Sequence, residues 1–252
     1  MSVQARFIGL RLMVAGALCC CLVACGDDEP TAPETPFSTK AGDYLWQGGI
    51  GTVWEYSFEE RATDTNGVTT QPDQMSRIRI TLIDTGITRK GVAGLTVYVQ
   101  EGFIGSVVDD TDTLYYSRST DSVFAHRLPL HSRDGMEVVL AGPLTVGSRF
   151  RRFPTATSPG DTATAVINAV NVLRQTPAGT FRTVQTVSTN TFDVGDSFRT
   201  ITVVERDETS SAVGCGLVYG YSERLFLYGT EGTPKTETKT RTVKLIRIDR
   251  KP

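Results

Sequence analysis

The residues of this chain that could do chemistry are few, and their spacing does not match a known metal site. The two histidines, His126 and His131, lie on either side of Pro129, which favours an extended backbone. Two imidazoles are too few ligands for zinc, so surface histidines are the simpler interpretation. The run Asp109-Asp110-Thr111-Asp112 is predicted to lie in a loop. We favour a solvated turn over a weak calcium site, because the run lacks the glycine and closing glutamate of a calcium-binding loop. We therefore predict no metal and no cofactor.

Motifs for a nucleophile or a bound phosphate are absent from the sequence. It contains no Gly-x-Ser-x-Gly elbow and no Gly-x-x-x-x-Gly-Lys-Ser/Thr loop. The sequence thus favours a protein without enzymatic activity. The alternative is a hydrolase whose carboxylates and histidine converge only in the folded protein. Its candidate residues are His126 or His131 with Asp109, Asp112 or Glu137.

A short basic run lies just past the middle of the chain, at residues 149–152. Arg149, Arg151 and Arg152 surround Phe150. In a strand, alternation would place Arg149 and Arg151 on one face and Phe150 and Arg152 on the other. A solvated strand face explains the run without an anionic partner.

The N-terminus has the pattern of an export signal. Residues 1–11 carry Arg6 and Arg11, and the uncharged run from 12 to 24 is apolar but too short to span a bilayer. The run ends in Leu22-Val23-Ala24-Cys25-Gly26, which resembles the lipobox of bacterial lipoproteins. The resemblance implies a signal peptide of residues 1–24, cleavage before Cys25 and lipidation of its thiol. The alternative is an ordinary secretory signal followed by a chance cysteine.

Cysteine usage agrees with an acylated N-terminus. Cys19, Cys20 and Cys21 would leave with the signal peptide, and Cys25 would carry lipid. Only Cys215 would remain, so the mature chain could form no internal disulfide. Its neighbours are glycine and aliphatic residues, which favours a small buried residue over a reactive thiolate.

Residues 25–41 are predicted to form a flexible tether, because they combine prolines with acidic residues. Removing Arg6 and Arg11 leaves 24 basic against 28 acidic residues, a formal charge of −4. This balance argues against nucleic acid as a partner and leaves membrane attachment to the acyl chains on Cys25. In enteric bacteria, aspartate after the lipidated cysteine favours inner-membrane retention. Gly26 therefore points to the outer membrane.

Residues 42–252 are predicted to form an all-β, mostly antiparallel domain, namely a large curved sheet, a half-barrel or a β-sandwich with few or no helices. Trp54, Tyr56 and Phe58 alternate with polar residues, as expected of a strand with one buried face. Residues 163–174 could also form an amphipathic helix, but their threonines favour a strand. The other predicted strands lie near 78–82 and 95–99 and at 113–117, 121–127, 136–141, 180–189, 198–205, 216–228 and 238–249.

Short glycine motifs recur along the chain. Gly51-Thr52-Val53-Trp54 and Gly147-Ser148-Arg149-Phe150 each place a glycine three residues before an aromatic, which suggests two similar halves, about 42–141 and 142–252. The order G-x-x-W, P-L-x-x-G-x-x-[WF], P-A-G-T-F and G-L-V spans about residues 48–220. It resembles a broad set of uncharacterised bacterial lipoproteins. The resemblance implies a fold and an envelope location and assigns no activity.

The sequence therefore predicts an envelope lipoprotein with a non-enzymatic structural, interaction or binding role. One alternative is a carrier that holds an apolar ligand inside the sheet, and the other is the envelope hydrolase. Partners could then be an envelope protein or a small apolar molecule, besides the bilayer itself, and the sequence sets no oligomeric state. The carrier's cavity would be lined by Trp54, Tyr56, Phe58, Leu217, Tyr219 and Tyr221. A core filled by these side chains would leave no such cavity.

Overall fold

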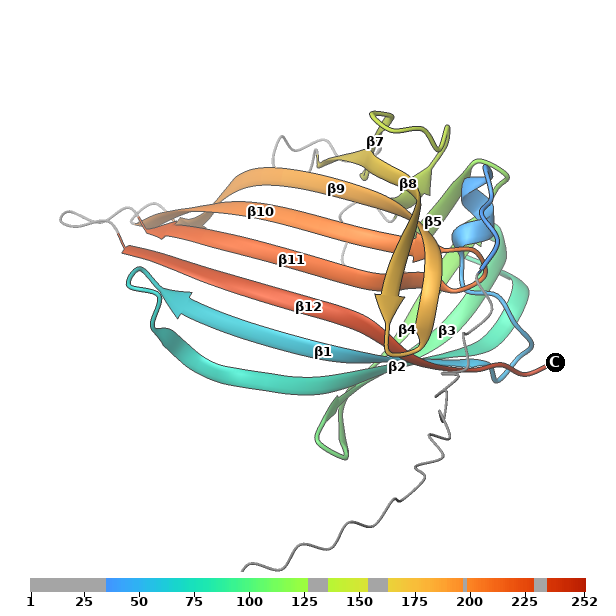
Figure 1. The fold of residues 1–252 in the computed structure, drawn as a ribbon, viewed down its shortest axis with the longest axis horizontal. Coiled ribbons are helices and arrows are strands. Elements are labelled where there is room, and N and C mark those ends of the chain that lie inside the picture. The colour runs from blue at the N-terminus through green and yellow to red at the C-terminus, as the bar shows by residue number, and fades with distance from the viewer. Residues whose placement is uncertain (1–34, 127–135, 154–162, 197–198, 229–234) are drawn as a thin grey trace, which may run out of the picture. The chain divides into compact units, whose positions relative to one another are not determined.

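The computed structural model describes residues 35–126, 136–153, 163–196, 199–228 and 235–252. These residues form one antiparallel sheet of 12 strands and a short 3-10 helix, so the predicted all-β curved sheet is confirmed (Figure 1). The elements in chain order are η1 (Ala41–Tyr44), β1 (Val53–Asp64), β2 (Thr69–Arg89), β3 (Val92–Ile104), β4 (Val107–Arg118), β5 (Ser122–His126), β6 (Met136–Ala141), β7 (Arg149–Arg151), β8 (Thr164–Thr176), β9 (Gly179–Asp196), β10 (Arg199–Ala212), β11 (Gly216–Tyr228) and β12 (Lys235–Asp249).

The strands follow one another as a meander that starts and ends in the middle of the sheet. Their spatial order is β6-β5-β4-β3-β2-β1-β12-β11-β10-β9-β8-β7. The first strand therefore pairs with the last, from Val53↔Asp249 to Asp64↔Glu237. The two halves suggested by the sequence each supply six consecutive strands, and β6 and β7 form the two edges of the sheet.

The two G-x-x-aromatic motifs form the same joint at the start of β1 and of β7. Gly51 and Gly147 have φ of +90° and +87°, which glycine adopts without a steric penalty. Gly51 N donates to Leu82 O at 2.7 Å, and Gly147 N donates to Ile167 O at 2.8 Å. In turn, Leu82 N donates to Thr52 O at 3.0 Å, and Ile167 N donates to Ser148 O at 2.8 Å. Both aliphatic side chains are fully buried, so each joint fixes a strand start against the core.

The segment that contains η1 covers one end of the strands (Figure 1). Gly42 N donates to Thr120 O at 3.2 Å, in the β4–β5 turn, and Gln47 N donates to Gly214 O at 3.0 Å, in the β10–β11 turn. The folded body begins before the predicted boundary at residue 42. Thr35 Oγ1 accepts a hydrogen bond from Arg182 N at 3.1 Å, and Ala41 is completely buried.

The main core lies beneath this covering segment, on the concave face of the sheet. Trp46, from the segment, packs edge-to-face on Tyr98 and Tyr116, with ring centroids 5.5 and 5.2 Å apart. Trp46 Nε1 donates to Tyr56 Oη at 2.7 Å, and Tyr56 Oη donates to Leu217 O at 2.9 Å. Buried indole and phenol groups need such partners, and here they also fasten the segment to β1 and β11.

Several predicted elements differ from the observed ones. The segment 163–174, for which a strand was favoured over a helix, lies in strand β8 from Thr164 onward. The run Asp109–Asp112 lies in the middle of β4, so its prediction as a loop was wrong. Aspartate is disfavoured in strands, but pairing with residues 100–102 of β3 outweighs that local preference. Among the described residues, no helix has both the length and the apolar character needed to cross a membrane.

Candidate functional site

The concave face contains a cavity of about 200 Å³ between the two halves of the sheet. One side, the apolar wall, comes from η1 and strands β4–β6. It consists of Tyr44, Leu45, Tyr116, Val123, Ala125 and Val139. The facing side, the polar wall, comes from β9 and β10. It consists of Thr186, Ser188, Asp207, Thr209 and Ser211.

The polar wall follows from strand register. Thr186 is paired with Thr209, and Ser188 is paired with Asp207, so alternate residues of β9 and β10 project side by side. The hydroxyls of Thr186 and Thr209 bond to each other at 2.7 Å. Two neighbouring strands thus present a row of hydroxyls and a carboxylate to the cavity.

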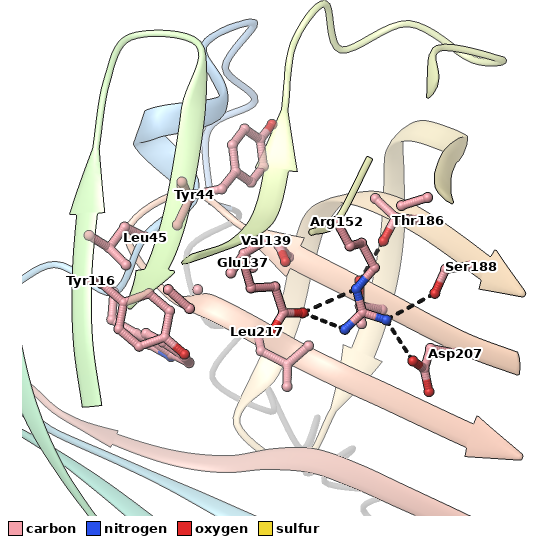
Figure 2. Close-up of a pocket in the computed structure, with 17 residues that line it drawn as sticks. Tyr44, Leu45, Tyr116, Glu137, Val139, Arg152, Thr186, Ser188, Asp207 and Leu217 are labelled. Carbon is pink, nitrogen blue, oxygen red and sulfur yellow. Dashed lines mark hydrogen bonds and ion pairs between the residues drawn. The ribbon is translucent and has the colours of Figure 1, made fainter. Parts of the chain in front are cut away.

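Arg152, directly after β7, joins both edges of the sheet to the polar wall (Figure 2). Its Nη2 and Nε donate to Glu137 Oε1 of β6 at 2.5 and 3.1 Å. Its Nη1 donates to Asp207 Oδ2 at 2.7 Å and to Ser188 Oγ at 3.0 Å. We call Glu137, Arg152, Ser188 and Asp207 the Arg152 cluster.

The Arg152 cluster is largely shielded from solvent. The side chains of Arg152, Glu137 and Asp207 are 26%, 15% and 21% exposed. Burial alone would lower the pKa of Arg152, but the charges and hydrogen bonds of Glu137 and Asp207 outweigh it and raise that pKa. The guanidinium is therefore permanently charged, and it lies between the two carboxylates.

Two further cavities of about 180 and 250 Å³ adjoin the first, and Arg152 and Asp207 border all three. Each contains an arginine that already has a carboxylate partner. Arg224 Nε donates to Glu205 Oε1 at 2.7 Å, and Arg241 Nε donates to Glu60 Oε2 at 2.6 Å. The 180 Å³ cavity is lined mainly by polar groups, whereas Phe58, Tyr221 and Val243 give the 250 Å³ cavity a mainly apolar lining.

The aromatic residues proposed as a cavity lining do not gather around one cavity. Trp54 and Tyr56 are fully buried in the core. Phe58 and Tyr221 border the 250 Å³ cavity. Leu217 borders the first cavity. Tyr219 instead packs under the guanidinium of Arg174, 4.1 Å from its ring centroid.

The groups proposed for a hydrolase are also not brought together. Glu137 is paired with Ala125, which borders the cavity, so the neighbouring His126 belongs to the opposite face of the sheet. His126 Nε2 lies 2.7 Å from Ser117 Oγ. Asp109 and Asp112 are exposed in β4, and His131 lies outside the described residues. Within the described ranges, no three metal-ligating side chains cluster closely enough to hold an ion.

Cys215 is completely buried, as its surroundings in the sequence suggested. The fold brings Arg250 Nη2 to 3.5 Å from its Sγ, a contact that the sequence did not indicate. Burial raises the pKa of the Cys215 thiol, and the Arg250 charge only partly offsets this effect. The thiol is therefore neutral at physiological pH. Cys25, the proposed lipidation site, lies outside the described residues.

The sequence did not indicate the Arg152 cluster. The prediction that Arg152 lies on a solvated strand face is wrong, whereas Arg149 and Arg151 are exposed as predicted. A period-two row of polar residues, Glu205-x-Asp207-x-Thr209, was visible in the sequence. Such a row on one face of a strand marks either solvent or a polar cavity, and only the curvature of the sheet separates the two.

Comparison with known proteins gives a weak likeness of fold. No family model and no curated protein matches the sequence. A solved structure from Bacteroides fragilis, described as a candidate exported protein with a YmcC-like fold, has a TM-score of 0.46 and 11% identity over 82% of this chain and 99% of its own. A candidate lipoprotein from Parabacteroides distasonis has a TM-score of 0.45 and 12% identity over 83% of this chain and 99% of its own.

Proposed function

We propose that this chain is a bacterial envelope lipoprotein, held at the outer membrane by acyl chains on Cys25, whose sheet binds a small amphiphilic molecule in its concave cavity. The observation that carries the binding role is the cavity itself, in which an apolar wall faces a polar wall across about 200 Å³. Ligand sites are concave and mostly apolar, with a few polar groups that fix orientation.

The lipid anchor is supported by the order of residues at the N-terminus. The apolar run from 12 to 24 ends at Ala24-Cys25-Gly26 and is followed by a segment rich in proline and acidic residues. A single acyl chain gives marginal, reversible attachment, so stable anchoring requires more than one. The formal charge of −4 gives the mature chain no general attraction to anionic lipid.

An amphiphile fits the cavity better than a pure hydrocarbon. A hydrocarbon could cover the apolar wall, but it would also displace water from the hydroxyls and carboxylate of the polar wall without replacing the lost hydrogen bonds. A fully polar solute would leave the exposed apolar surface of this wall, that of Val139 above all, uncovered. A molecule with one apolar and one polar part satisfies both walls.

Cavity binding can be tested with N-phenyl-1-naphthylamine, an uncharged probe that becomes brighter in apolar surroundings. We expect saturable brightening with the wild-type protein and its loss in Ala125→Phe, because Ala125 borders the cavity and a phenyl group would fill it. Ala93→Phe is the matched control, since Ala93 is exposed in β3. Equal brightening by both variants, with circular dichroism confirming that both are folded, would contradict binding in this cavity.

The anchor is tested separately in a bacterium that expresses the full chain. Mass spectrometry of the mature wild-type protein should show Cys25 as its first residue with acyl mass attached. Cys25→Ala should release the protein from the membrane fraction into the soluble fraction. Wild-type protein that retains residues 1–24, or that starts with an unmodified thiol, would refute the anchor. Separation of inner and outer membranes then tests the proposed location.

A further inference from the structure

The floor of the first cavity continues into the 250 Å³ cavity. Leu217 of β11 borders the first cavity, and Val243 of β12 borders the 250 Å³ cavity. Gly220 lies between these two side chains, since a Cβ at this position would be 3.6 Å from Cδ2 of Leu217 and 3.8 Å from Cβ of Val243. Phe58 of β1, which is paired with Val243, extends the same surface. The two cavities therefore share one apolar floor, with a glycine where they meet.

The backbone at Gly220 does not require glycine. Its φ lies outside the left-handed region, and it pairs regularly with Thr209 on one side and Val243 on the other. The bulge of β11 lies earlier, at Val218. A Cβ at Gly220 would make only ordinary van der Waals contacts, at 3.6 to 3.9 Å. Glycine within a strand often marks a place where a ligand approaches the backbone closely, and here it keeps the passage between the cavities open.

The polar groups that the two cavities share lie beside this passage. Arg152, Asp207 and Thr209 border both cavities, and Thr209 is paired directly with Gly220. The hydrogen bond between the hydroxyls of Thr186 and Thr209 uses one of their two hydrogens. The pair therefore keeps one hydrogen to donate as well as lone pairs to accept. An amide or a hydroxyl on the ligand, which both donates and accepts, complements such a pair.

Apolar side chains lie on both sides of these polar groups. In the first cavity they belong to the apolar wall and include Leu45 and Val139 (Figure 2). In the 250 Å³ cavity they include Phe58 and Val243. A ligand with its polar group at one end covers only one of these surfaces, whereas a ligand with its polar group in the middle covers both. Each further methylene that becomes buried should tighten binding about fourfold.

We propose that the two cavities form a single site for an amphiphile whose polar group lies between two apolar arms. This inference rests on the proposed function and names the ligand class of the same site. The polar group lies at Thr209, where it both donates and accepts. One arm lies against the apolar wall, and the other passes over Gly220 to Phe58 and Val243.

Two isomeric amides isolate the position of the polar group. N-Pentylpentanamide has its amide in the middle of the chain and decanamide has it at one end, while both contain the same atoms. In isothermal titration of the wild-type protein, N-pentylpentanamide should bind at least about tenfold more tightly, because it buries methylenes in both cavities. Equal affinities, or tighter binding of decanamide, would overturn the inference.

Gly220→Leu tests the passage between the cavities. A leucine side chain would occupy the floor there, so N-pentylpentanamide should bind about tenfold more weakly and lose its advantage over decanamide. Gly102→Leu is the matched control. Gly102 is also a strand glycine with φ outside the left-handed region and ordinary contacts at its Cβ position, and it is not among the described residues that border the three cavities. An advantage that persists in Gly220→Leu as it does in Gly102→Leu would overturn the inference.

Ser222→Phe is a second variant, which does not change the glycine. Ser222 borders the 250 Å³ cavity and not the first one, so a phenyl group there would fill only the space of the second arm. The advantage of N-pentylpentanamide should disappear, while brightening of the naphthylamine probe in the first cavity should remain. Ala93→Phe again serves as the control, and circular dichroism checks that each variant is folded. A preserved advantage in folded Ser222→Phe, or loss of naphthylamine binding, would contradict the arrangement of two compartments.

The two proposals fail in different ways. If the naphthylamine probe binds and Ala125→Phe abolishes its binding, while the two amides bind equally well, the cavity function stands and the ligand class is wrong. If neither the naphthylamine probe nor either amide binds, both proposals are wrong. Binding of N-pentylpentanamide that is insensitive to Ala125→Phe would place the amide outside the first cavity and overturn the inference.

Discussion

At the scale of the residue, Gly216 shows how closely the covering segment approaches the sheet. Its φ is +65°, and a Cβ at this position would lie 2.6 Å from the ring of Trp46. We expect Gly216→Ala to lower the free energy of unfolding by about 2–4 kcal/mol, because overpacking adds to the strain of positive φ. Urea denaturation with a far-ultraviolet circular dichroism readout measures this loss.

Gly67→Ala is the control for the backbone term. Gly67 has a similar φ of +74°, but no atom lies within 4 Å of its Cβ position. Gly67→Ala should lower the free energy of unfolding by about 1 kcal/mol, which is the cost of the left-handed conformation alone. Equal losses for the two variants would show that Trp46 does not press on Gly216.

His126 gives the chain a dependence of stability on pH. Burial lowers its pKa below the usual value, so the unfolded chain takes up a proton at a higher pH than the folded protein does. Stability should therefore fall as pH drops below about 6.5 and level off below the folded pKa. The melting temperature measured at about pH 7.5 and about pH 5.5 should differ less in His126→Gln than in the wild type. An unchanged difference would exclude His126 as its source.

At the scale of the element, the two edges of the sheet meet at the Arg152 cluster. Val138 N of β6 donates to Arg152 O at 2.7 Å, beside the ion pair with Glu137. Arg152→Met should cost about 2 kcal/mol, since it removes hydrogen bonds to charged, partly buried groups. Hydrogen exchange of the Val138 amide should accelerate as the edges separate.

Arg149→Met is the control for this variant, because Arg149 is exposed in β7, the strand that ends directly before Arg152. A surface substitution of this kind should change stability by less than about 0.5 kcal/mol. If both variants leave the Val138 amide equally protected, the ion pair does not hold the edges together.

Strand β11 was predicted correctly from local sequence, whereas the Asp109–Asp112 run was not. The bounds of β11 were predicted correctly, because the segment begins at a glycine and consists largely of aliphatic and aromatic residues that favour strands. The Asp109–Asp112 run lies in a strand instead of the predicted loop, because pairing with β3 overrides the low preference of aspartate for strands. Pairing between strands is a property of the whole sheet, so composition alone could not reveal it.

The candidate site was harder to predict than the strands. Glu137, Arg152 and Asp207 come from three separate strands or their ends, and they meet only because the sheet curls. Nothing within a few residues of Arg152 distinguishes a solvated arginine from one that faces a cavity. The aromatic residues of β1 were predicted to share one face, and Trp54, Tyr56 and Phe58 do so, but two of them fill the core.

At the scale of the whole molecule, the two halves use equivalent joints at Gly51 and Gly147. Replacing either glycine with alanine should cost about 1–2 kcal/mol, because both have φ near +90°. In the double variant, the loss in free energy of unfolding should equal the sum of the two single losses to within about 0.5 kcal/mol, since the two joints share no partner. Urea denaturation of the three variants checks this. A Gly147 variant as stable as the wild type would show that the two joints are not equivalent.

The pairing of β1 with β12 has a consequence for how the protein is made. Of the described strands, β1 leaves the ribosome first, and its partner on one side, β12, leaves it last. The middle of the sheet therefore stays incomplete while nearly all of the polypeptide emerges, and closing so long a loop carries an entropic cost. The β1–β12 pair can form only once β12 has emerged, and contacts between residues so far apart in the sequence slow folding.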